Sequence, residues 1–242
     1  MKRLVQVGPA LNAYKFTFDD NLLDELRRLY FSALSHGLAA PQNASIFEGG
    51  AQISLSISVA NYKFHLLSYG KTPLLWVSSG NRPAYDIFKR FADSLEIEND
   101  LKELVDCNQN LVMYSGFFVV GNRLPVENWH LDYDDGANAY TLITPLFELD
   151  RSHGHLLYKD TAGNVQTYRY KRHKAIVFGD RFPHSTECYG KSPIIRALVS
   201  FTIGTDKPEY WNVLRHTIGN QGNFMYLPCG HERGTCDCCK EA

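Results

Sequence analysis

NWHLDYDD, residues 128–135, places His130 and Asp132 two positions apart. In a β-strand, or directly at its end, side chains two residues apart point to the same face. An imidazole and a carboxylate on the same face can bind one metal ion. The spacing therefore predicts a pair of metal ligands in a region of β-structure.

The sequence around this pair is typical of a barrel or sandwich of short strands. Alternating or continuous apolar runs are separated by Gly, Asp, Asn and Pro turns. We expect eight strands, in residues 110–121, 129–134, 138–149, 154–160, 165–171, 174–180, 184–189 and 194–204.

Before this β-region, helical and strand patterns follow one another. Residues 17–38 carry leucines at helical spacing and predict a helix, and residues 52–59, 62–69 and 73–79 predict short strands. After Pro83, residues 84–106 predict one or two amphipathic helices that pack on the outside of the sheet.

Length and composition suit one globular domain with a folded core. The 242 residues carry 25 basic and 26 acidic side chains, a net charge of -1, so no nucleic acid or membrane partner is expected. No apolar run is long enough to span a bilayer, and none at the start suits a signal peptide. We expect a cytoplasmic protein of unspecified oligomeric state, with one domain over residues 1–228 and a Cys-rich tail over residues 229–242.

A second imidazole completes a candidate metal site. His184 follows an apolar run at residues 175–178 and a Gly-Asp turn, so a neighbouring strand can bring it beside His130 and Asp132. Two His and one carboxylate on one side of an iron ion leave three adjacent positions open. A closed structural zinc site would leave none.

Arg196 lies within IIRALVSFTIG, residues 194–204, an otherwise apolar strand. A buried guanidinium needs an anion to satisfy its hydrogen-bond donors. The carboxylate of a small organic acid would suit it.

With these four residues the sequence resembles the Fe(II)- and 2-oxoglutarate-dependent dioxygenases of the double-stranded β-helix (jelly-roll, cupin-like) fold. The shared pattern is His-x-Asp, a distant His, and an Arg or Lys soon after it, and it covers residues 110–205. The resemblance implies an α+β fold with a mainly β core buttressed by N-terminal helices. It also implies that His130, Asp132 and His184 bind catalytic Fe(II) and that Arg196 binds 2-oxoglutarate. The aspartate argues against the halogenases of this family, which carry Gly or Ala at that position.

The second contact of the co-substrate is open at this stage. Many family members carry Ser two residues after the Arg, whereas this chain has Leu198 there. Ser200 and Thr202 follow on the same face, and Tyr140 and Tyr158 are alternative partners.

The resemblance implies that 2-oxoglutarate is converted to succinate and carbon dioxide while an unactivated C–H bond of a second substrate is hydroxylated. Desaturation or ring closure are alternative outcomes. A small-molecule substrate is expected rather than a protein. The alternatives are a protein or peptide hydroxylase of the same family and a non-catalytic cupin-like protein that binds a small molecule.

Several residues near the metal pair are candidates for substrate contact. Trp129, Tyr133 and Asp135 flank the ligands at the expected barrel mouth, and Arg123 precedes them. Ordinary packing or turn roles are the alternative for each. Four further histidines, at positions 153, 155, 173 and 216, lie in polar stretches and are expected in solvated loops.

The tail carries a dense group of soft ligands, namely Cys229, His231, Cys236, Cys238 and Cys239. They could hold a tetrahedral zinc ion if the loop closes, although their spacing differs from the commonest zinc signatures. The alternative is a mobile tail with oxidation-sensitive thiols. The two other cysteines are isolated, so the protein core is expected to be reduced.

Overall fold

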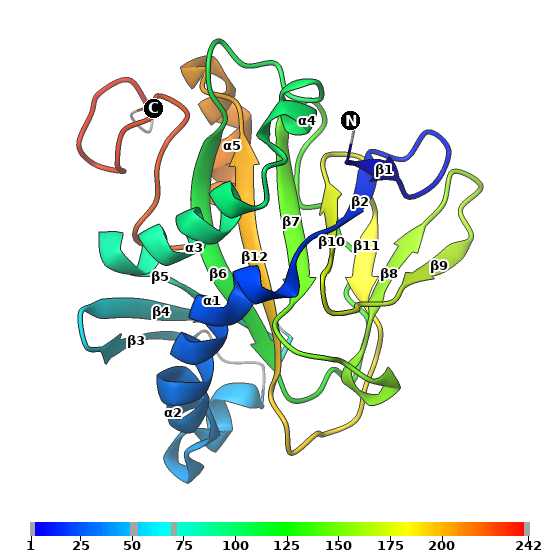
Figure 1. The fold of residues 1–242 in the computed structure, drawn as a ribbon. Coiled ribbons are helices and arrows are strands. Elements are labelled where there is room, and N and C mark those ends of the chain that lie inside the picture. The colour runs from blue at the N-terminus through cyan, green and yellow to red at the C-terminus, as the bar shows by residue number, and fades with distance from the viewer. Residues whose placement is uncertain (1–2, 49–52, 69–71, 240–242) are drawn as a thin grey trace.

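Residues 3–48, 53–68 and 72–239 are described by a computed structural model of the chain. Two antiparallel sheets face each other (Figure 1). The larger consists, in spatial order, of β1 (Val5–Gln6), β2 (Ala13–Thr17), β10 (Lys174–Phe178), β7 (Ala139–Pro145), β12 (Arg196–Gly204), β6 (Val112–Gly121), β5 (Leu75–Ser79), β4 (Tyr62–Ser68) and β3 (Ser54–Val59). The smaller consists of β11 (His184–Thr186), β8 (Leu156–Lys159) and β9 (Val165–Tyr168).

The central strands of the large sheet are buried on both faces, which explains their nearly continuous apolar sequences. Register places Leu198 of β12 between Val119 of β6 and Pro145 of β7. Alternate β12 residues, including Val199 and Phe201, point to the opposite face and join the cluster beneath the helices. The core therefore has one layer between the sheets and one between sheet and helices.

Helices cover the outer face of the large sheet, as predicted (Figure 1). They are η1 (Asp20–Leu23), α1 (Asp24–Leu29), the π-helical η2 (Tyr30–Leu34), α2 (Ser35–Ala39), η3 (Pro41–Phe47), α3 (Arg82–Ser94) and α4 (Glu98–Lys102). Asp19 and Asn81 cap the first helical segment and α3 by accepting backbone N–H bonds. Where α3 crosses β6, a Cβ on Gly116 would lie 2.3 Å from that of Phe88, so only glycine allows this approach.

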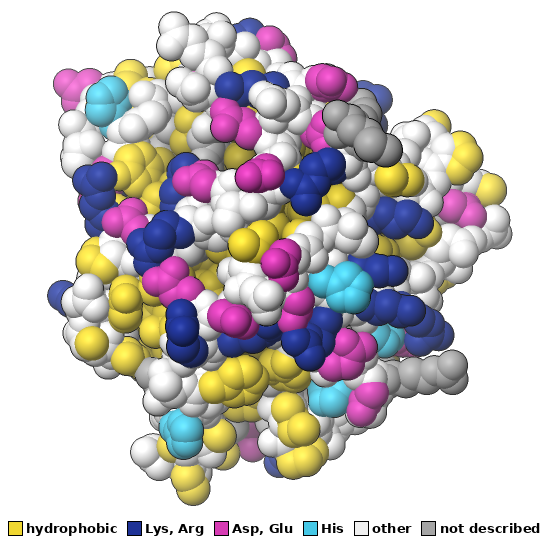
Figure 2. Space-filling model, in the orientation of Figure 1, with side chains coloured by type: hydrophobic (Ala, Val, Ile, Leu, Met, Phe, Trp, Pro, Cys, Tyr) yellow, Lys and Arg dark blue, Asp and Glu magenta, His cyan; other side chains and the backbone are white. Residues whose placement is uncertain are grey.

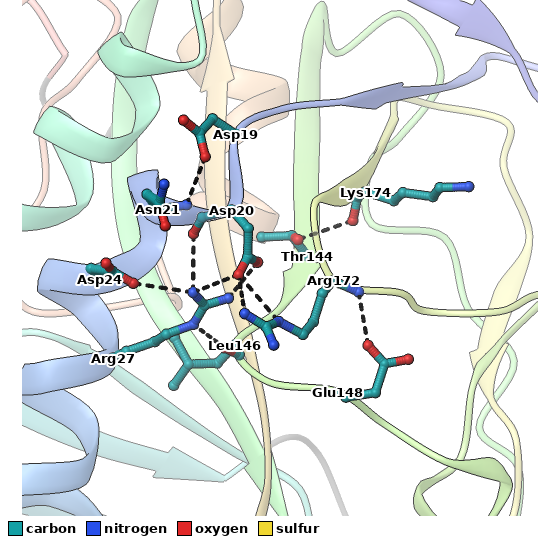
Figure 3. A network of polar contacts seen from close by, with 10 residues as sticks. All are labelled: Asp19, Asp20, Asn21, Asp24, Arg27, Thr144, Leu146, Glu148, Arg172 and Lys174. Atoms are coloured by element: carbon teal, nitrogen blue, oxygen red, sulfur yellow. Dashed lines mark hydrogen bonds and ion pairs between the residues drawn. The ribbon is translucent and has the colours of Figure 1, made fainter.

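A polar network joins the first helical segment to the large sheet (Figure 3). Asp20 accepts two hydrogen bonds from Arg27, at 2.5 and 2.9 Å, and pairs with Arg172, which precedes β10. Arg27 also donates to the carbonyl of Leu146 after β7. These contacts lower the pKa of Asp20 to about 2, Arg27 contributing most. The face drawn in Figure 2 otherwise intersperses acidic and basic side chains, in keeping with the near-zero net charge.

Most expected elements are present, and the exceptions are local. The strand predicted at residues 129–134 is wrong, because only His130 pairs, in an isolated bridge with His184. The missed elements include the strands β1 and β2, the helix α5 (Trp211–Ile218) and the short 3-10 helix η3; β2 spans only five positions, too few for a clear pattern. The predicted strand ends at residues 52 and 69 lie outside the described ranges. None of the helices within those ranges is long and apolar enough to cross a membrane.

Candidate metal centre and co-substrate pocket

A cavity of about 330 Å³ lies between the two sheets and reaches α5. His130, Asp132 and His184 contribute to its lining. Apolar side chains from the large sheet form much of its wall, among them Trp76 and Phe117. The three predicted ligands therefore meet at a concave, partly apolar site, which is the usual setting for a small-molecule reaction.

Backbone pairing brings the two histidines together. His130 and His184 exchange two N–H···O bonds of 3.0 Å each, so their side chains leave the same face of the small sheet. Their ring centroids are 4.3 Å apart, and each Nε2 lies 3.5 Å from Oδ1 of Asp132. Asp132 comes from the loop that follows the bridge, so strand geometry is not what aligns it with His130.

The two imidazoles are oriented for metal binding by their other nitrogen. Nδ1 of His130 lies 2.7 Å from the carbonyl of Asn128, and Nδ1 of His184 lies 2.9 Å from that of Phe182. A carbonyl can only accept, so each Nδ1 donates its proton, and each Nε2 is the nitrogen turned toward Asp132 and able to bind a metal. This backbone support is typical of metal-ligating histidines.

A hydroxyl relay holds the carboxylate in place. Thr141 of β7 donates to Oδ2 of Asp132 at 2.7 Å, and its own oxygen lies 2.9 Å from the hydroxyl of Tyr133. Because the Thr141 proton is already donated, Tyr133 donates to Thr141. Thr217 of α5 donates to the backbone carbonyl of Asp132. Oδ1 is left facing the histidines.

The protonation states also suit a cation site. Burial alone would raise the pKa of Asp132, but His184, His130 and Thr141 outweigh it and lower this pKa to about 2. Burial lowers the pKa of His184 below its usual value. Burial opposes charging of His130 as well, yet contact with Asp132 raises its pKa overall. The difference follows exposure, since 25% of the His130 side chain is accessible against 6% for His184.

The donor set fits a ferrous ion better than a closed structural site. All three ligand atoms lie within 4.8 Å of one another and come from two nitrogens and one carboxylate oxygen. All three residues line the cavity, so a metal held by them would be accessible from it. A metal held here would keep open positions for a bidentate co-substrate and dioxygen.

Arg196 is completely buried, and its charge is not compensated within the described residues. Its Nε donates to the carbonyl of Gly154 at 3.3 Å, whereas its two terminal nitrogens have no hydrogen-bond partner among the described residues. Its guanidinium carbon lies 5.5 Å from the ring centre of Tyr170, a residue of the cavity wall. Burial raises the pKa of Tyr170 to about 12, and the charge of Arg196 opposes that rise. Behind Tyr170, a residue of the cavity wall, the fold thus keeps two buried donors that are unsatisfied within the described residues and suit an anion.

The four residues predicted as a second hydrogen-bond partner of the co-substrate lie in different surroundings. Ser200 lines the cavity, but its hydroxyl donates to the Leu142 carbonyl. Thr202 is buried in a network with Ser115 and Gln221. The prediction for Tyr140 is wrong, because it lies on the helix-covered face and donates to Asn12. Tyr158 stacks on Phe182 and lines a neighbouring cavity instead.

The predicted substrate contacts lie outside the described cavity. Tyr133 is buried beneath Asp132, and its role is to support Thr141. Asp135 pairs with Arg181 on the surface. Trp129 donates to Glu127 and packs under Lys159, while Arg123 donates to the Glu48 carbonyl. Packing and turn roles therefore account for these four residues.

Several residues of the site were missed because only the tertiary structure brings them in. Thr141 and Tyr170 come from strands expected only as scaffold, and Tyr189 has a buried hydroxyl without a partner among the described residues. His216, Thr217, Asn220 and Gln221, in and just after the missed α5, line one side of the cavity. His153 and His155, expected in solvated loops, are buried.

In the tail the structure brings together four of the five predicted ligands. Cys229, His231, Cys236 and Cys238 place their ligand atoms within 4.8 Å of one another. Cys239 is not part of this group; it is buried in a cluster with Trp211 of α5, and its thiol contacts that of Cys229.

Comparison with known proteins agrees with this architecture. No family model matches the chain, and none of the curated proteins is significantly similar to it in sequence. Among solved structures, AviO1 from Streptomyces viridochromogenes Tue57 superimposes with a TM-score of 0.52 at 11% identity, covering 84% of this chain and 90% of that one. The non-heme alpha ketoglutarate dependent epimerase SnoN from nogalamycin biosynthesis gives 0.51 at 12% identity, covering 81% and 78%.

A third similar structure is HygX from Streptomyces hygroscopicus with nickel and 2-oxoglutarate bound. It gives a TM-score of 0.50 at 11% identity, covering 81% of this chain and 83% of that one. At such identities the likeness concerns the backbone arrangement and not the side chains. The chain therefore has a double-stranded β-helix fold, which is the backbone arrangement that it shares with these three structures.

Proposed function

We propose that this protein is an Fe(II)- and 2-oxoglutarate-dependent oxygenase that oxidises an unactivated C–H bond of a small molecule. His130, Asp132 and His184 hold the iron, and Arg196 binds the far carboxylate of 2-oxoglutarate. When bound, iron and 2-oxoglutarate together supply the oxidising power, and the co-substrate leaves as succinate and carbon dioxide.

The observation that carries this proposal is the buried, uncompensated guanidinium of Arg196. A buried charge without a counter-ion destabilises the folded state by several kcal/mol, and binding of an anionic ligand would offset this loss. The fork of two terminal nitrogens matches a carboxylate in shape. A dicarboxylate with one end on the metal and the other on Arg196 would occupy the cavity lengthwise.

Tyr189 is the best candidate for the missing hydroxyl partner. Its buried hydroxyl has no partner among the described residues. Burial raises the pKa of Tyr189, and the charge of Arg196 opposes this rise. Gly121, the cross-strand partner of Arg196, has its Cβ position 3.0 Å from this hydroxyl. A carboxylate on Arg196 would therefore have Tyr189 within reach. This tyrosine would do what the serine does at the position of Leu198 in many relatives.

The remaining cavity suits a compact substrate with both apolar and polar parts. Trp76, Val119 and the half-exposed Leu131 offer an apolar surface. His216 and Asn220, at the α5 side, offer polar groups. A volume of about 330 Å³ is at the small end for ligand sites, which favours a small molecule over a folded protein.

Epimerisation is a second candidate outcome, favoured by the structural likeness to SnoN, which is an epimerase. Both reactions begin with removal of a hydrogen atom from carbon. They differ in what returns to that carbon, which depends on residues near the substrate. Product mass separates them, because hydroxylation adds one oxygen atom and epimerisation leaves the mass unchanged.

The direct test is succinate release from 2-oxoglutarate by the purified chain with iron, ascorbate and dioxygen, first alone and then with a panel of small molecules. We expect slow release without substrate and faster release with the correct compound. Asp132→Ala should abolish both iron binding and succinate release, whereas Asp134→Ala, an exposed neighbour, should leave them intact. Undiminished release by the Asp132 variant would contradict the proposal, and no release by the native chain would favour a non-catalytic binding protein.

A further inference from the structure

A cluster of three thiols and one imidazole lies beside α5, outside the cavity that the iron ligands line. Sγ of Cys236 is 3.4 Å from Sγ of Cys229 and 3.2 Å from Sγ of Cys238, and Nδ1 of His231 is 4.0 Å from Sγ of Cys238. All four ligand atoms lie within 4.8 Å of one another. Such proximity of four soft donors is the arrangement of a tetrahedral metal site.

We propose that Cys229, His231, Cys236 and Cys238 bind a structural zinc ion. Zinc–sulfur bonds of about 2.3 Å place the sulfurs of a tetrahedral site about 3.8 Å apart, close to the separations seen here. A disulfide would require about 2.05 Å, and all of these cysteines are free. Three thiolates and an imidazole select zinc, whereas the His-Asp-His set between the sheets suits iron.

The backbone around the ligands is folded into two turns that deliver them together. Tyr226 and Glu232 form an isolated bridge, and Leu227 donates to the carbonyl of His231 at 2.8 Å. Gly230 and Gly234 have φ values of +76° and +83°, a region that glycine occupies without strain. The first turn presents Cys-x-His and the second presents Cys-x-Cys. The ligands are therefore positioned by the fold and do not depend on chance contacts in a tail.

The zinc loop also contacts the elements that build the iron pocket. Arg233 donates to the carbonyl of Gly219 at the end of α5 at 2.9 Å, and Tyr226 donates to the Tyr114 carbonyl of β6. Leu227 and Cys239 pack into one cluster with Trp211 of α5.

Zinc would therefore hold α5 against β6, and α5 carries residues that line the cavity. Thr217 of α5 also donates to the backbone carbonyl of Asp132, an iron ligand. The zinc ion would act as a structural clamp, with no part in the chemistry.

Zinc content measured on the full chain tests this inference independently of oxygenase activity. The His130→Ala/Asp132→Ala variant, which lacks the iron ligands, should still contain one zinc per chain after purification under reducing conditions. Adding Cys236→Ser and Cys238→Ser should remove it. Adding Cys107→Ser and Cys188→Ser instead, two cysteines distant from the cluster, should leave it in place.

Cobalt(II) reconstitution of the same His130→Ala/Asp132→Ala variant covers the case in which the cysteine variants fail to fold. Tetrahedral thiolate coordination should produce an intense sulfur-to-cobalt absorption band that zinc abolishes by displacement. Absence of stoichiometric zinc together with absence of this band would overturn the inference, as would zinc that survives loss of Cys236 and Cys238. Neither result would bear on succinate release by the native chain.

Discussion

The two terminal nitrogens of Arg196 are buried and have no hydrogen-bond partner among the described residues. We therefore expect a bound anion to contact them. Arg196→Met keeps the size of the side chain and removes the charge. We expect the KM for 2-oxoglutarate to rise about 100-fold or more, because two charge-assisted hydrogen bonds are lost. The ligand-free protein should be as stable as the native one or more stable, because the uncompensated charge is gone.

Initial rates over a range of 2-oxoglutarate, together with urea unfolding of the ligand-free protein, check this expectation. Arg181→Met is the matched control, because Arg181 is exposed and pairs with Asp135 on the surface. An unchanged KM in the Arg196 variant would show that the co-substrate binds elsewhere.

Tyr189 is expected to contribute less than Arg196 to the binding of 2-oxoglutarate. Tyr189→Phe removes one hydroxyl, and we expect a rise of roughly 10- to 50-fold in the KM for 2-oxoglutarate, the effect of one hydrogen bond to a charged group. Tyr168→Phe is a matched control, because the Tyr168 hydroxyl is also buried without a partner among the described residues but lines a different cavity. Equal effects of the two substitutions would exclude a specific contact of Tyr189 with the co-substrate.

Among the elements, the junction of η1 and α1 with the large sheet depends on Asp20 (Figure 3). Its pKa falls from 3.8 to about 2 on folding, so the folded state favours the ionised form. The resulting stability is fully present above the pKa of the unfolded chain, near 4, and is lost as the pH falls toward 2.

Asp20→Asn should lower the free energy of unfolding at neutral pH by about 1 kcal/mol, less than the pKa shift alone would give, because solvent screens these surface charges. The difference from the native protein should shrink below pH 4 and vanish near pH 2. Urea unfolding at a series of pH values measures both effects. A constant difference across this range would mean that packing, and not charge, accounts for the loss.

For the molecule as a whole, the site between the sheets should couple ligand binding to stability. A ligand that binds only the folded state stabilises it by about 2.7 kcal/mol at a concentration of one hundred times its Kd. For a chain of this length that corresponds to a rise in Tm of about 5 °C or more.

We expect this rise when nickel, which does not support turnover, and 2-oxoglutarate are added together, and a much smaller one with 2-oxoglutarate alone. Differential scanning calorimetry measures it. In Asp132→Ala the combined effect should disappear, because the co-substrate loses its metal partner. A rise of full size in that variant would place 2-oxoglutarate outside the proposed centre.

The sequence by itself determined the class of fold and the set of candidate metal ligands. Apolar periodicity is a local property, so the strands of residues 110–204, except the one at residues 129–134, and the helical regions over residues 17–38 and 84–106 could be predicted with roughly the observed bounds. The candidate site could be predicted from the types, order and spacing of His130, Asp132, His184 and Arg196, because these are properties of the sequence alone. The reason proposed for pairing His130 with Asp132 was wrong, since Asp132 lies in a loop.

Only the tertiary structure decided which residues complete the site. Strand register turns Tyr140 away from the cavity, and the chain path brings α5 to the cavity and Tyr189 to the surroundings of Arg196 from distant positions. These outcomes depend on which face of a strand is covered and on contacts between residues far apart in sequence. No local pattern encodes them. The same reason explains the thiol cluster, whose ligands are visible in the sequence but whose closure around one point is a property of the folded chain.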